Sequence, residues 1–168
     1  MIVLGIDPGL TRCGYAVLES GSGRTVKTLA LGVIRTPPSS PLPQRLAELK
    51  VELASLIAQF RPHAVAVEQV FFQVNVRTAM SVGQASGLAL AEAAAAGCDV
   101  MQYTPNQVKN NVAGWGGADK LQVQKMVQAR LGLASVPEPP DAADAAALAL
   151  CHLAMMPGAG RVVVGGTR

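Results

Sequence analysis

The stretch "MIVLGIDPGLTRCGYAVLE", residues 1–19, decides how the fold begins. Its first apolar run ends at Asp7 and is closed by Pro8-Gly9, and a second run, "RCGYAVLE", follows within hairpin distance. A third run, "TLALGVIRT", comes after another short interval. The three runs predict an antiparallel three-stranded start, and they leave a single carboxylate, Asp7, at the end of the first strand.

The middle of the chain changes from a strand pattern to a helix pattern and back. Between the proline-rich stretch 37–43 and Pro62, apolar residues fall on one helical stripe, which predicts an amphipathic helix. The stripe consists of Leu46, Leu49, Leu53, Leu56, Ile57 and Phe60. The next segment, "HAVAVE", has no polar alternation, as expected of a central strand in a parallel sheet that is covered on both faces.

The second half of the chain is predicted to be mainly helical. Its elements are an Ala- and Gly-rich helix at 78–96, a strand at 98–103 and helices at 104–112, 118–131 and 141–156. Thr104 and Pro105 suit the N-cap and the first position of one of these helices. The order of elements predicts an α/β domain with one mixed sheet of five strands, three antiparallel and then two parallel, flanked by helices on both faces.

Length and composition restrict the class of protein. The 168 residues suit one domain, expected over residues 1–157, with a short flexible tail at 158–168. Three cysteines without CxxC spacing indicate a reducing cytosol, and the chain has neither a basic leader nor an apolar span of about 20 residues. We therefore expect a cytoplasmic protein with no membrane contact. The net charge is +3, and the bases gather between 100 and 137, which suits either a polyanionic partner or a solvated helix face.

Two carboxylates lie at predicted strand ends. Asp7 shares a strand face with Val3 and Gly5, and Glu68 shares one with two alanines. Small residues let a helix approach the sheet closely and leave both carboxylates at its rim. An Asp before Pro-Gly equally suits a simple turn cap, so both interpretations stay open.

Asp141 and Asp144 form a second pair, because residues three apart share one face of a helix. An Asp directly after two prolines is also a good N-cap, and an acid three residues later resembles a capping box. If all four acids converge, they cannot stay ionised together without cations, since like charges raise one another's pKa. Carboxylates without His or Cys favour Mg²⁺ or Mn²⁺.

Such a site predicts hydrolysis of phosphodiesters. Two Mg²⁺ ions about 4 Å apart can activate a water and stabilise the leaving oxygen. Assigning four of the eleven acids to metal leaves fourteen bases against seven acids elsewhere, a balance that suits nucleic acid.

Motifs that occur in order along residues 1–156 resemble those of the RuvC family of bacterial crossover-junction (Holliday junction) endonucleases, within the ribonuclease H-like superfamily. The motifs are "GIDPG", "GYAV", "VEQVFF", "GQASG", "QVK" and "PDAADAAALA". The resemblance implies a ribonuclease H-like fold with Asp7, Glu68, Asp141 and Asp144 as catalytic ligands of Mg²⁺. It also implies a homodimer that works with the RuvAB branch-migration complex in DNA recombination and repair. The dimer would resolve a four-way junction by symmetric nicks in two strands of like polarity, leaving 5′-phosphate ends.

The resemblance further implies DNA contacts. One aromatic after Glu68, Phe71 rather than Phe72, would stack on an unpaired base, with Asn75 and Arg77 near the cleaved strand. Lys109 and Lys120 match basic family positions linked to DNA binding and catalysis. Taken alone, the phenylalanines equally suit a core and the lysines a solvated surface. The sequence leaves Trp115 between a loop anchor and a DNA contact.

Two rival functions remain at this stage. The segment Asp7-Pro8-Gly9 with Thr11 also resembles the phosphate loop of actin-like sugar kinases and ATPases, although that fold needs two such domains. A non-catalytic junction-binding module would keep the fold, but it would have no need of four intact carboxylates.

Overall fold

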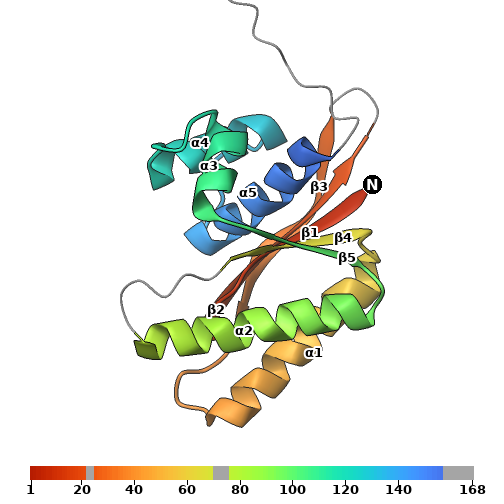
Figure 1. The fold of residues 1–168 in the computed structure, drawn as a ribbon, viewed down its shortest axis with the longest axis vertical. Helices are drawn as coiled ribbons and strands as arrows, with labels where there is room; N and C mark the ends of the chain where they lie inside the picture. Colours follow the sequence, from red (N-terminus) through yellow and green to blue (C-terminus); the bar gives the residue numbers. More distant parts are fainter. Residues whose placement is uncertain (22–24, 70–75, 157–168) are drawn as a thin grey trace, which may run out of the picture.

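The computed structural model describes residues 1–21, 25–69 and 76–156, and for residues 76–78 the backbone alone (Figure 1). The strands are β1 (Ile2–Asp7), β2 (Arg12–Ser20), β3 (Val26–Arg35), β4 (Ala64–Glu68) and β5 (Asp99–Tyr103). The helices are α1 (Leu42–Phe60), α2 (Val76–Ala95), α3 (Pro105–Ala113), α4 (Lys120–Leu131) and α5 (Pro140–Met155). The predicted order of strands and helices is thus confirmed.

The five strands form one mixed sheet in the order β3-β2-β1-β4-β5. The pairs β1–β2 and β2–β3 are antiparallel, whereas β1–β4 and β4–β5 are parallel. The predicted sheet, with three antiparallel strands followed by two parallel ones, is therefore confirmed. β1 lies at its centre, where the direction of pairing changes.

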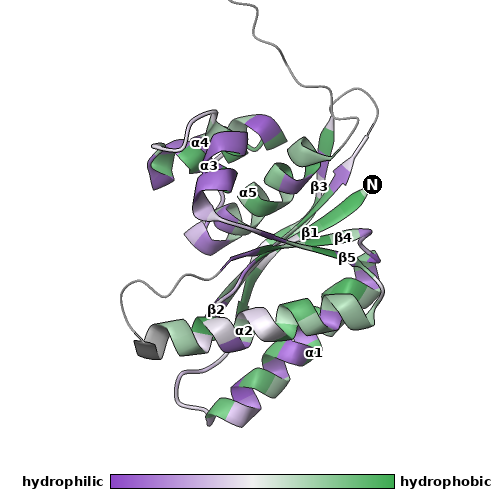
Figure 2. Cartoon of the chain, viewed as in Figure 1, coloured by the Kyte–Doolittle hydropathy of each residue, from purple (hydrophilic) through white to green (hydrophobic). Residues whose placement is uncertain are grey.

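Helices cover both faces of the sheet (Figure 1). α1 and α2 pack on one face, over a core that includes Leu4, Ile6 and Val65. α5 crosses the other face, against β1 and β2, and α3 and α4 pack on its outer side. Figure 2 shows β1 and much of α5 as hydrophobic and α3 as mostly hydrophilic, in keeping with this layering. Among the helices of the described chain, none is long and apolar enough to cross a membrane.

The N-terminal ends of α3 and α5 test two predictions about helix caps. Thr104 caps α3 in a full capping box with Gln107, as its sequence predicts. α5 instead begins at Pro140, its N-cap is Pro139, and no side chain caps it. The alternative in which Asp141 is an N-cap is therefore wrong, and the carboxylate of Asp141 is available for other contacts.

Candidate active site

Asp7 and Glu68 are the last residues of neighbouring parallel strands, so they lie at the same end of the sheet. β1 and β4 are parallel, and Ile6 lies opposite Val67, so the two acids that follow are neighbours. The backbone N–H of Gln69 donates to the carbonyl of Tyr103 at 2.9 Å and extends the pairing of β4 with β5 past Glu68. Both carboxylates are thereby held by the most central part of the sheet.

α5 brings two more acids to this end because it touches the sheet through backbone atoms. A Cβ placed on Gly5 would lie 2.0 Å from the carbonyl oxygen of Ala145, and one on Gly14 would lie 2.0 Å from that of Asp141. Only glycine allows such an approach. The close helix expected at Gly5 is present, and Gly14 is a second contact that the sequence interpretation missed.

The electrostatics of Asp7 and Glu68 reflect crowding of negative charge. Burial raises the pKa of Asp7 to about 8, with further upward contributions from Glu68, Asp144 and Asp141. The pKa of Glu68 is also raised, first by burial and then by Asp144, although a hydrogen bond with Asp7 acts against the rise. A proton or a cation is therefore needed for both carboxylates to be stable at neutral pH.

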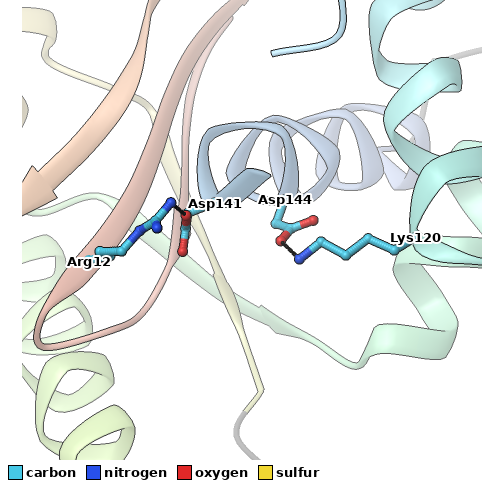
Figure 3. Close-up of polar contacts among 4 residues, drawn as sticks. All are labelled: Arg12, Lys120, Asp141 and Asp144. Atoms are coloured by element: carbon cyan, nitrogen blue, oxygen red, sulfur yellow. Dashed lines mark hydrogen bonds and ion pairs between the residues drawn. The ribbon is translucent and has the colours of Figure 1, made fainter. Parts of the chain in front are cut away.

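Two cations of the chain bind the acids of α5 (Figure 3). The Nη2 of Arg12 donates to Oδ2 of Asp141, and the Nζ of Lys120 donates to Oδ2 of Asp144 at 2.7 Å. The hydrogen bond to Asp144 raises the pKa of Lys120. Arg12 comes from the start of β2 and Lys120 from the first turn of α4, so the pair of acids is approached from two sides.

The donor set fits a hard divalent cation, because it consists of carboxylates with excess negative charge and a desolvated member. The side chains do not converge on one point, however. Within residues 1–21, 25–69 and 76–156, no three His, Cys, Asp or Glu side chains lie close enough together to hold one ion.

Other expected site residues lie away from these contacts or outside the described residues. Phe71, Phe72 and Asn75 fall in the segment 70–75, which the structure does not describe, and of Arg77 only its place on α2 is given. Lys109 lies on α3 and forms no ion pair within the described part of the chain. Trp115 is 55% exposed, and its ring lies against its own loop, since a Cβ added to Gly117 would be 2.3 Å from Cζ3 of the indole.

The ion pair of Arg12 with Asp141 is a site contact that the sequence did not predict. Arg12 lies 129 positions from its partner Asp141, and an arginine after a turn carries no pattern that distinguishes it from a solvated one. The alternation of strand faces could have predicted this contact. Arg12 and Gly14 are two residues apart and share one face of β2, and Gly14 is the residue that α5 touches.

A mixed five-stranded sheet with carboxylates at the ends of β1 and β4, and two more on the helix that crosses them, defines the ribonuclease H-like class of nucleases. The model of the family "Crossover junction endodeoxyribonuclease RuvC" matches residues 3–152, and the chain belongs to this family rather than to the actin-like kinases.

Relatives of known name agree with this family. A crossover junction endodeoxyribonuclease RuvC from Corynebacterium jeikeium is 49% identical over 89% of the chain and 91% of the relative. One from Salinispora arenicola is 53% identical over 91% of the chain and 87% of the relative. A solved structure, T. thermophilus RuvC in complex with Holliday junction substrate, has a TM-score of 0.86 and 40% identity, and the match covers 91% of this chain and 93% of that one.

Proposed function

We propose that the chain is a metal-dependent endonuclease that resolves Holliday junctions. The observation that carries the proposal is the meeting of Asp7 and Glu68 with the acid pair of α5, where burial and mutual repulsion raise the pKa of Asp7 to about 8. Family membership supports the nuclease activity, and the relative solved with a Holliday junction supports the substrate.

In this proposal Asp7, Glu68, Asp141 and Asp144 hold two Mg²⁺ ions, for which Mn²⁺ can substitute. When bound, the metal supplies a water of lowered pKa and stabilises the charge of the leaving oxygen. The chain's own part is to fix the four carboxylates on rigid elements. Lys120, 2.7 Å from Asp144, is placed to neutralise charge that develops on the phosphate.

The proposal includes the DNA contacts that the sequence implies. The segment that carries Phe71, Phe72 and Asn75 leaves β4 directly after Glu68, so these residues would meet a strand whose phosphate lies at the carboxylates. Arg77 at the start of α2 and Lys109 on α3 would bind flanking phosphates.

The proposed assembly is a homodimer, since two symmetric nicks need two sites. The small residues of α2 allow a close pairing with a second copy, and cooperation with RuvAB is proposed from the family alone. We further propose a nuclease domain over 1–157, followed by a tail, in a protein that works in the cytoplasm.

A synthetic four-way junction and a linear duplex of the same sequence test this function. With Mg²⁺ or Mn²⁺ the chain should nick the junction and leave the duplex intact, and equal cutting of both would refute resolution. Asp7→Asn should abolish nicking and keep junction binding. Asp99→Asn is the matched control, because it makes the same change at the far end of β5. A wild-type chain that binds the junction without nicking it would favour the non-catalytic binding module.

A further inference from the structure

Arg12 forms an ion pair with one of the four acids of the candidate site. It opens β2 directly after the turn that follows Asp7, and it binds the first acid of α5 (Figure 3). The side chains of Arg12 and Asp141 are 39% and 25% exposed. The ion pair is therefore partly exposed, and an ion or a substrate can reach it.

Asp141 satisfies only part of the Arg12 side chain. A guanidinium carries five N–H donors in a planar fork. The Nε of Arg12 is buried and has no hydrogen-bond partner among the residues that the structure describes. The arrangement thus leaves donor capacity unused, which is the state expected of a side chain that has a second position with a better acceptor.

A metal on Asp141 would compete for the oxygen that Arg12 now holds. The group is crowded with negative charge: Glu68, Asp144 and Asp141 all raise the pKa of Asp7, and Arg12 and Lys120 pair with the two acids of α5. Two divalent ions offset this negative charge. Arginine does not lose its proton, so an Arg12 side chain that is displaced from Oδ2 of Asp141 remains a cation and needs another anion.

The surroundings of Arg12 favour a phosphate as that anion. Arg35 lies directly opposite Arg12 in the β2–β3 register, so two guanidinium groups share one face of the sheet edge. Arg45 binds the hydroxyls of Thr11 and Thr36 close by, at 2.6 and 2.9 Å. Arg12 and Arg35 are thus neighbouring bases on this face, and the DNA backbone is the anion that the proposed reaction brings to the site.

We propose that Arg12 is an exchangeable counter-ion of the site. It holds Asp141 in the metal-free protein, gives it up when a divalent cation binds, and then binds a phosphate of the DNA strand. The last step rests on the proposed function, whereas the exchange with metal does not. Lys50 and Glu92, which join α1 to α2 at 3.6 Å, show the contrasting case of an ion pair with no metal competitor.

The first test is the affinity for Mn²⁺ without DNA, measured by titration calorimetry. Arg12→Gln should bind Mn²⁺ about three- to tenfold more tightly than wild type, because the metal no longer displaces a charged hydrogen bond. Arg45→Gln removes the same charge nearby but touches only hydroxyls, and it should stay within about twofold. Equal affinities for wild type and Arg12→Gln, or weaker binding by the variant, would overturn the proposal.

Thermal unfolding in EDTA establishes whether Arg12→Gln is folded. If it is not, Arg12→Lys replaces it: this variant keeps the charge but replaces the planar guanidinium by a more strongly hydrated ammonium, so Mn²⁺ should bind more tightly than to wild type by a smaller factor. Unchanged or weaker Mn²⁺ binding by Arg12→Lys would count against the exchange.

The second test is the salt dependence of junction binding in Ca²⁺ and in EDTA. In Ca²⁺ the slope of log affinity against log salt should be smaller by about one for Arg12→Gln than for wild type, since one phosphate contact is lost. In EDTA the two slopes should agree, because Arg12 is then held by Asp141. Equal slopes in Ca²⁺ would refute the phosphate contact. If Arg12→Gln binds Mn²⁺ more tightly than wild type but the wild-type chain never nicks a junction, the proposed function is refuted and the exchange is left intact.

Discussion

Gly14→Ala is the substitution for which the structure makes the sharpest prediction. The new Cβ would lie 2.0 Å from the carbonyl oxygen of Asp141, 2.6 Å from its carbonyl carbon and 3.2 Å from its Cβ. Ordinary contact begins at 3.4 Å. β2 and the first turn of α5 must therefore separate by about 1.4 Å, the difference between the two distances, and neither partner can turn away because both are backbone.

The energetic consequence follows from this separation. Overpacking of this kind costs about 1–3 kcal/mol in the free energy of unfolding, and each kcal/mol lowers Tm by about 2–4 °C in a chain of this size. The same movement carries Asp141 and Asp144 away from Asp7. A displacement of about 1 Å lowers turnover by about 100-fold, so junction nicking should fall more than junction binding.

Thermal unfolding and a junction-nicking assay with saturating Mg²⁺ measure the two effects of Gly14→Ala. Gly87→Ala in α2, where an added Cβ meets nothing within 4 Å, is a control for the free energy of unfolding only, because α2 is the proposed dimer helix. This change should stabilise the helix by about 0.5–1 kcal/mol, the difference in helix propensity. If Gly14→Ala melts and nicks like wild type, the backbone contact between β2 and α5 does not set the site.

Other predictions concern titration and turnover. The raised pKa of Asp7 means that the folded, metal-free state holds this proton more tightly than the unfolded state, so the free energy of unfolding should fall as pH rises from about 4 to about 8. Asp7→Asn should remove that fall. In urea melts with EDTA the variant should be more stable than wild type at pH 8, by about 1.4 kcal/mol for each unit by which the pKa of Asp7 is raised, and no more stable near pH 4. Lys120→Gln should lower kcat by about 100-fold and junction affinity by less than about threefold, and equal losses in both would contradict its role at the phosphate. Tyr103→Phe deletes the 2.8 Å hydrogen bond with Nδ1 of His152, whose Nε2 already lacks a partner within the described chain. The change should lower the free energy of unfolding by about 1–3 kcal/mol in thermal or urea melts and leave nicking otherwise intact.

The sequence predicts the sheet and the place of the strand-end acids because both depend on local pattern. "HAVAVE" indicates a parallel strand, and parallel strands end at one edge, so Asp7 and Glu68 can be expected to meet. Small residues on the faces of β1 and β4 indicate a closely packed helix, and α5 packs there.

The contacts of Arg12 and Gly14 depend instead on register. A shift of one residue in the β1–β2 hairpin would turn both residues to the other face of the sheet. Nothing in the turn after Asp7 specifies which register forms. The cap of α5 also escapes local rules. Asp141 has the sequence of an N-cap, yet the helix begins one residue earlier and leaves its carboxylate free for Arg12.

The four acids come from the first, the fifth and the last of the described secondary-structure elements, which are β1, β4 and α5. A ribosome makes the chain from its N-terminus, so a nascent chain that ends before α5 carries only half of the carboxylates. It also lacks the helix that covers Val3, Ala16 and Ala66 on that face of the sheet. The four carboxylates can therefore come together only after α5 has been made.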